Sequence, residues 1–148
     1  MLRCLLPILC LGACAEVALP YNQEWDPPTN PTAAAPEGAD TAAKLVWMLL
    51  EGEDGRLPLV HWVSEGPCLE GVGDPSKCHT GFYHYFPETD THEVWCLVMP
   101  KLRQSAIIHE LTHAALQDTE GDPDAPHAGP RWGEIPEVRQ KLIDVGAY

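Results

Sequence analysis

The sequence predicts an α+β domain in which a small, mostly antiparallel sheet of about three strands packs beside three helices. Two observations favour this class. Residues 105–116 combine apolar side chains at helical spacing with the motif His-Glu-x-x-His. Residues 57–99 contain three short runs rich in β-branched and aromatic side chains, separated by turn-forming residues. One further helix is expected before these segments and one after them.

Residues 1–13 have the pattern of an export signal, with a positive start, an almost wholly apolar stretch and small residues after it. We exclude them from the fold. The run Leu11-Gly12-Ala13-Cys14 resembles a bacterial lipobox, and this resemblance implies that Cys14 becomes the lipidated N-terminus of a cell-envelope lipoprotein. Ordinary cleavage after Ala15, which would secrete the protein, stays open, as does the choice between inner and outer membrane.

Residues 14–38 are predicted to form an extended linker after the lipidated cysteine, because prolines interrupt a stretch rich in alanine, threonine and asparagine. The folded domain is expected to span residues 39–148. Its first helix begins at Asp40 or Thr41, either of which can cap it, and runs to about Glu51. Apolar side chains on one side of this segment predict a core helix.

Three strands are expected next, at Leu57–Val63, Gly81–Phe86 and Glu93–Met99. The turn-forming residues 87–91 predict that the last two strands form a hairpin. One face of the second strand is expected to pack on helices and the other to line a cleft. Four histidines in this region are interpreted as ordinary strand or loop residues: His61, His79, His84 and His92.

Cys68 and Cys78 flank a loop rich in glycine and proline. Because disulfides persist where exported proteins reside, a bond between these two cysteines is expected, with a stabilisation of about 2 to 3 kcal/mol. Cys96 would then remain a buried thiol in the third strand. Pairing of Cys78 with Cys96 stays open.

His109 and His113 lie four positions apart in the predicted helix at residues 105–116. This spacing places both imidazoles on one helix face, where they can bind the same ion. Glu110 lies about 100° around the axis, where its carboxylate can reach a water on that ion without binding the ion itself. The pattern is typical of metal hydrolases. The competing interpretation is two polar histidines on an amphipathic helix that bind nothing.

A catalytic zinc ion usually takes three protein ligands, so a third must come from outside this helix. His127 is the preferred candidate, because its loop is stiffened by proline and glycine and neutral imidazole suits zinc. Four acidic residues stay open as alternatives: Glu134, Glu137, Asp118 and Asp124. A final helix is predicted from about Pro136 to Val145.

The segments His109-Glu110-Leu111-Thr112-His113-Ala114-Ala115 and His127-Ala128-Gly129-Pro130-Arg131-Trp132 resemble the SprT-like (Spartan-like) zinc metallopeptidases, which are zincins of the HExxH type. The resemblance implies a minimal zincin-like fold, three zinc-binding histidines at the positions discussed above, and Glu110 as catalytic acid/base. Ala128 stands where the family commonly has glycine. The family's basic DNA-binding extension and zinc-ribbon cysteines are missing, so an association with DNA is not expected.

The expected function is therefore that of a zinc-dependent metallopeptidase in which Glu110 activates a water on the metal. Tyr83, Tyr85 and Arg131 are the candidates for stabilising the oxyanion. The alternative is a non-catalytic envelope lipoprotein with a structural or vestigial metal site.

The expected partners are a peptide or protein substrate, bound as an extended strand along a sheet edge, and a membrane reached through the lipid anchor. The chain is expected to be a monomer. Its net charge of −13 at pH 7 repels phosphate backbones, so nucleic acid is not an expected partner.

Overall fold

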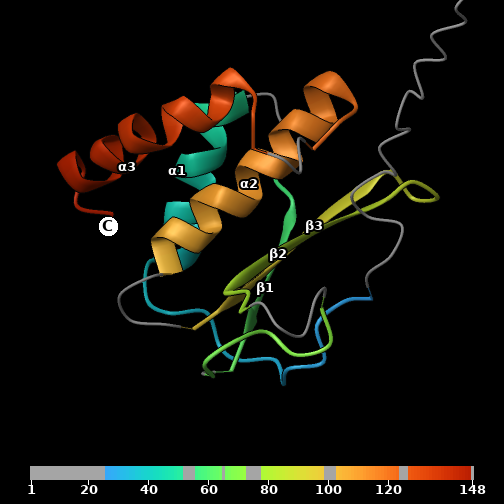
Figure 1. Ribbon diagram of the computed structural model, residues 1–148. Helices are drawn as coiled ribbons and strands as arrows, with labels where there is room; N and C mark the ends of the chain where they lie inside the picture. The colour runs from blue at the N-terminus through green and yellow to red at the C-terminus, as the bar shows by residue number, and fades with distance from the viewer. Residues whose placement is uncertain are drawn as a thin grey trace, which may run out of the picture.

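The computed structural model describes residues 26–51, 56–64, 66–72, 78–98, 103–123 and 127–147. The predicted signal, the predicted lipidation site Cys14 and the alternative ligand Asp124 lie outside these ranges. The elements, in chain order, are α1 (Ala39–Glu51), β1 (Leu59–Val63), β2 (Gly81–Phe86), β3 (Thr91–Leu97), α2 (Arg103–Glu120), a 3-10 helix η1 (Pro130–Glu134) and α3 (Ile135–Asp144), shown in Figure 1. The predicted α+β class is confirmed.

The sheet has the strand order β1-β3-β2, so β1 and β2 are its two edges. β2 and β3 form the predicted antiparallel hairpin, with Gly81 opposite Cys96 and Phe86 opposite Thr91. β1 pairs with β3 in parallel, which makes the sheet mixed. In sequence, β2 follows β1 but lies at the other edge of the sheet. β3 then occupies the position between the two strands, where it runs parallel to β1 and antiparallel to β2.

The three helices lie on one face of the sheet (Figure 1). α2 packs between the sheet and the pair α1 and α3, which explains why apolar residues surround it on almost all sides. Strand side chains alternate between the two faces. Those on the helix face join the main core, whereas Phe82, Trp95 and Leu97 form a second cluster with Leu69 and Val72 on the opposite face.

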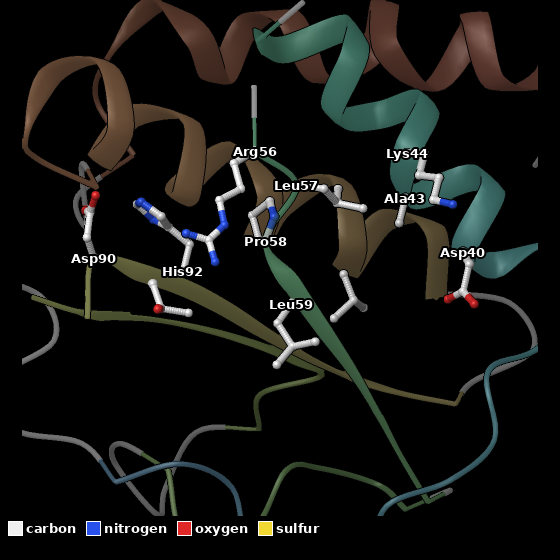
Figure 2. Close-up of a pocket in the computed structure, with 11 residues that line it drawn as sticks. Asp40, Ala43, Lys44, Arg56, Leu57, Pro58, Leu59, Asp90 and His92 are labelled. Carbon is white, nitrogen blue, oxygen red and sulfur yellow. The ribbon is translucent and has the colours of Figure 1, made fainter. Parts of the chain in front are cut away.

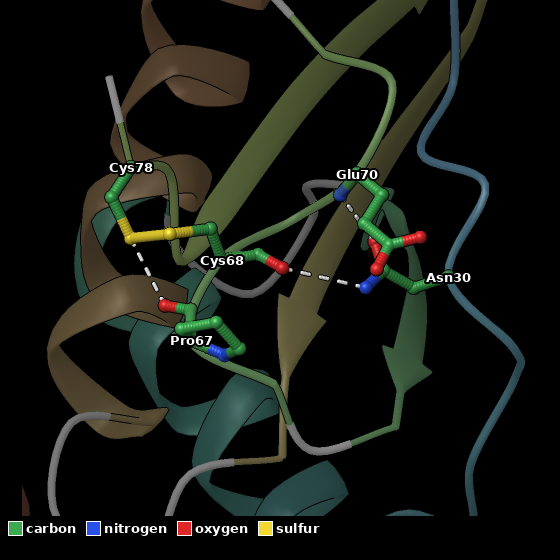
Figure 3. The surroundings of a disulfide bond; sticks show 5 residues. All are labelled: Asn30, Pro67, Cys68, Glu70 and Cys78. Carbon is green, nitrogen blue, oxygen red and sulfur yellow. Dashed lines mark hydrogen bonds between the residues drawn. A yellow bond between two sulfur atoms is a disulfide. The ribbon is translucent and has the colours of Figure 1, made fainter. Parts of the chain in front are cut away.

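The end of the predicted linker lies on the folded domain. The Thr29 amide donates to the Glu70 carbonyl at 2.9 Å, and the Ala33 amide donates to the Trp62 carbonyl of β1 at 2.8 Å. The side chain of Asn30 bonds to both Cys68 and Glu70 (Figure 3). Residues 29–33 therefore connect the edge of β1 to the loop before β2.

Cys68 and Cys78 are joined by a disulfide bond (Figure 3). Cys96 is a buried free thiol. The disulfide closes the loop that precedes β2. The Leu69 amide in this loop donates to the His79 carbonyl at 2.7 Å, so the disulfide holds a short segment against the beginning of β2. None of the helices in the described ranges combines the length and apolar character needed to cross a membrane.

Candidate metal centre

The first two candidate ligands lie one turn apart on α2. The ring centroids of His109 and His113 are 4.9 Å apart. His113 is fully buried and His109 is partly exposed, so the pair lies where the helix emerges from the core. The i, i+4 spacing of the motif therefore places both rings on one helix face, as the sequence predicts.

His127 comes to this pair from the loop between α2 and η1. Its backbone φ of 57° lies in the left-handed region, which residues other than glycine adopt at an energetic cost. The potential ligand atoms of His109, His113 and His127 all lie within 4.8 Å of one another. This is the one group of three converging His, Cys, Asp or Glu side chains in the part of the chain that the structure describes.

Hydrogen bonding leaves a lone pair on His113 for an ion. Nδ1 of His113 lies 2.6 Å from the Pro123 carbonyl oxygen, which can only accept, so Nδ1 carries the proton and donates it. Nε2 is then unprotonated, the form that a metal requires. It lies 3.2 Å from Nε2 of His127. Two nitrogens bound to one tetrahedral zinc at its usual bond lengths are about 3.3 Å apart. The pair thus has the spacing of two zinc ligands.

His109 is held neutral by its surroundings. Burial and, to a smaller extent, the neighbouring His127 together lower its pKa to about 4. A neutral imidazole is the form that binds metal, so this histidine needs no deprotonation at pH 7.

Trp132, which the sequence analysis did not single out as a site residue, packs against all three histidines. Its ring centroid lies 5.0 Å from that of His109, 4.7 Å from that of His113 and 4.4 Å from that of His127. η1 positions this indole beside the group. The aromatic wall restricts the rotamers of the three imidazoles and excludes water from one side of the site.

Glu110 points into the space between α2 and the sheet. It is only 5% exposed, and burial raises the pKa of its carboxyl to about 8. Its Oε2 atom is buried without a hydrogen-bond partner in the described structure. Because an unsatisfied buried carboxyl is costly, this atom fits a site in which a further polar group, such as a water on the metal, completes its bonding.

The carboxyl of Glu110 rests on Gly81, the first residue of β2. A Cβ atom added to Gly81 would lie 2.6 Å from Oε1 and 2.7 Å from Cγ of Glu110. No side chain fits between the helix and the strand at this position. Glycine at this position is a site feature that sequence reasoning missed, because it depends on how closely two separate elements approach.

His109 and Glu110 open into the same cavity, which has a volume of about 290 Å³. The start of β2 and the segment after the disulfide form its other walls, and the remaining lining residues are Cys78, His79, Thr80, Gly81 and Ala106. A candidate metal ligand and a buried carboxyl thus face one space at an edge of the sheet.

The alternative ligands in the described ranges lie elsewhere. Glu134 is exposed on η1, and the exposed Glu137 carboxylate lies 2.9 Å from Nζ of Lys141. Asp118 lies 4.0 Å from Nε2 of His92. None of the three belongs to the converging group.

Each of the three oxyanion candidates has a polar group bonded to a residue outside the converging group. Arg131 donates to the Leu50 carbonyl at 2.9 Å and to the Glu51 carboxylate at 3.0 Å, which ties η1 to the end of α1. The Tyr85 hydroxyl donates to Asp90 at 2.9 Å. The Tyr83 hydroxyl bonds to Nδ1 of His92 at 2.8 Å, while its ring stacks beside His113 at a centroid distance of 6.2 Å.

Comparison of the chain with protein-family models, with curated proteins and with solved structures finds no match.

Proposed function

We propose that this protein is a zinc-dependent metallopeptidase in which His109, His113 and His127 hold the metal and Glu110 is the general base. The observation that carries the proposal is the convergence of three imidazoles beside a cavity that also contains a buried carboxyl. The resemblance of the two histidine segments to SprT-like metallopeptidases supports the same assignment.

The metal and the side chains of the protein have separate roles in the proposed reaction. When bound, zinc supplies a Lewis acid that lowers the pKa of a water toward 7 and polarises the scissile carbonyl. Glu110 takes a proton from the attacking water and returns it to the leaving amine. Burial raises the pKa of Glu110 to about 8. A cation bound beside this carboxyl would lower its pKa and so favour the carboxylate, which is the form that accepts the proton. His113 is held in the required tautomer by Pro123.

The edge of β2 offers a place for an extended substrate. The Leu97 amide donates to the Thr80 carbonyl, so even-numbered residues of this segment direct their backbone groups toward β3. The backbone N–H and C=O groups of the odd-numbered residues Gly81 and Tyr85 therefore face the open edge of β2. A peptide added there would run past the cavity that contains His109 and Glu110. Its recognition would depend more on its backbone than on its side chains.

The competing function is that of an envelope protein whose metal is only structural. Structural zinc sites are closed by four protein ligands. The converging group contains three potential ligands, His127 is exposed, and a cavity adjoins the site. These features favour the catalytic proposal.

Zinc content tests the proposal first. Elemental analysis of the exported chain should find one zinc per molecule in the wild type and none after His109→Ala or His127→Ala. A wild type without zinc would exclude the metallopeptidase. Zinc retained after His127→Ala would instead indicate that Glu134 or Glu137 is the third ligand.

We also propose that the chain is exported and anchored through a lipid on Cys14. The disulfide supports an oxidising compartment. Mass spectrometry of the membrane fraction should find a lipidated Cys14 at the N-terminus, and Cys14→Ser should release the protein. An N-terminus at Glu16 would indicate secretion.

A further inference from the structure

The second edge of the sheet, formed by β1, is covered over only part of its length. The Trp62 carbonyl accepts from Ala33, and the Ser64 amide donates to the Pro31 carbonyl, so residues 31–33 pair with the C-terminal end of β1. The bridge between Thr32 and Val63 shows that this segment runs antiparallel to the strand. It ends before the N-terminal half of β1.

Backbone groups of Val60 face the uncovered part of this edge. The Val63 carbonyl accepts from Val98, next to β3, so odd-numbered residues of β1 bond toward the sheet and even-numbered residues face outward. Val60 therefore directs its N–H and C=O to the same side as Trp62. Within the described ranges, no backbone group bonds to Val60 on this side. An added peptide strand can use both groups.

A cavity of about 520 Å³ lies beside this open edge (Figure 2). Its walls come from the first turns of α1, the residues leading into β1 and the beginning of β3. The apolar part of its lining consists of Ala43, Leu57, Pro58, Leu59 and Val60. The volume lies within the range of about 300–1,000 Å³ that is usual for ligand sites.

Two cations of this cavity have donors available to a ligand. Arg56 and Lys44 line it, and neither has an ion-pair or hydrogen-bond partner among the described residues. Its two carboxylates are already engaged: Asp40 accepts from the Trp62 indole at 3.3 Å, and Asp90 accepts from the Tyr85 hydroxyl at 2.9 Å. Both carboxylates keep their charge, because their hydrogen-bond donors are neutral, so the four charged side chains sum to zero. Arg56 and Lys44 are the groups of this cavity whose donors are open to the carboxylate of a ligand.

Direction along the edge indicates where that negative group belongs on a peptide. An antiparallel strand that continues the path of residues 31–33 runs toward the N-terminal end of β1, so its C-terminus approaches Arg56. In Figure 2 the Arg56 side chain extends into the space between Leu57 and His92. A guanidinium there can hold a terminal carboxylate through two parallel hydrogen bonds.

We propose that the open half of the β1 edge binds the C-terminal end of an extended peptide. The peptide backbone pairs with Val60, its apolar side chains contact Leu57 and Leu59, and its terminal carboxylate binds Arg56. Lys44 supplies a further donor on the α1 side. This site lies across the sheet from the candidate metal centre and does not depend on the proposed peptidase activity.

The proposal is tested with the peptide acetyl-Ala-Val-Ala-Val as the free acid and as the C-terminal amide. Both are titrated into the isotope-labelled exported chain carrying Glu110→Gln, which prevents hydrolysis. Backbone NMR signals of residues 59–61 should shift with the free acid, and the amide should bind at least tenfold more weakly. The Arg56→Gln variant should reduce this preference to less than twofold, whereas Lys141→Gln, a charge change on α3, should preserve it.

Three results would overturn the site: equal binding of acid and amide, shifts confined to β2, or an unchanged preference in Arg56→Gln. Arg56→Lys keeps the charge and removes the planar fork, so an intermediate preference is expected. The dispersion of the NMR spectrum reports whether each variant is folded. Zinc content is measured on the same samples, so failure of this site is distinguishable from failure of the proposed metallopeptidase.

Discussion

The two edges of the sheet have similar backbones and different chemistry. Each is covered at one end by an irregular segment: Leu69 bonds to His79 before β2, and Ala33 bonds to Trp62 in β1. At the start of β2 a cavity contains His109 and the buried carboxyl of Glu110. The cavity beside the open half of β1 combines apolar groups with charged side chains and His92, and none of these belongs to the converging histidine group.

The difference comes from the neighbouring helix and loops. α2 brings an i, i+4 histidine pair and a buried carboxyl to β2, while α1 brings an aspartate, an alanine and a lysine to the cavity beside β1. An open sheet edge supplies peptide binding of low specificity in both places. Catalysis is expected only at the β2 edge, where α2 supplies histidines and a carboxyl. The predictions below test this division.

The largest effect is expected from Glu110→Gln. Removing the general base should lower peptide-hydrolysis turnover by about 10²–10⁴-fold, while zinc content stays at the wild-type value. Hydrolysis of a peptide library measures the first quantity and elemental analysis the second. Glu134→Gln is the matched control, because Glu134 is exposed on η1. Turnover that survives Glu110→Gln would exclude Glu110 as the general base.

Loss of the disulfide is expected to have the next largest effect. Replacing Cys68 and Cys78 together by serine should lower the free energy of unfolding by about 2–3 kcal/mol, because a loop of this length is no longer closed in the unfolded chain. Chemical denaturation measures the change. Turnover should also fall, since Cys78 lines the cavity that Glu110 faces. A reducing agent should destabilise the wild type and leave the double variant unchanged.

A methyl group at Gly81 is expected to displace the general base. The new Cβ meets Glu110 at 2.6 Å, so the carboxyl must move or the strand must shift. Gly81→Ala should lower turnover at least tenfold with zinc retained and cost about 1–3 kcal/mol of stability, as overpacking does.

Gly133→Ala is the control for Gly81→Ala, because nothing lies within 4 Å of a Cβ added there. In a double-mutant cycle, Gly81→Ala should cost little stability in the Glu110→Ala background, since the clashing side chain is gone. An equal cost in both backgrounds would show that the glycine serves the strand and not the carboxyl.

The elements were predictable because their signals are local. The apolar period of residues 105–116 and the turn between β2 and β3 each lie within one short segment. The third histidine of the converging group was also predictable, because the loop after α2 is stiffened by proline and glycine and neutral imidazole suits zinc better than the carboxylates nearby. These predictions needed no knowledge of distant contacts.

The features that sequence reasoning missed depend on contacts between distant segments. Arg131 was a candidate for the oxyanion, but its guanidinium bonds to the end of α1, 81 positions earlier. Residues 29–33 have the composition of a linker, yet they pair with β1, because proline and threonine suit an edge segment as well as a linker. The parallel pairing of β1 likewise followed from how the chain crosses the sheet.

The smallest effect is expected from His92, which contacts both regions. Its ring lines the cavity beside β1, and its Nδ1 bonds to the hydroxyl of Tyr83 in β2. Burial lowers its pKa below 6.5, although Asp118 and Asp90 oppose this and Arg56 reinforces it. Just below pH 6.5 the unfolded chain therefore binds more protons at this position than the folded chain does.

The contribution of His92 is present in full above pH 6.5 and is lost as the pH falls through the folded pKa. Chemical denaturation between pH 7.5 and pH 5 should show a smaller loss of stability in His92→Asn than in the wild type, because other groups contribute equally to both. An identical pH dependence would mean that the ring is as well solvated as in the unfolded chain. His92 would then not connect the two edges through a buried contact.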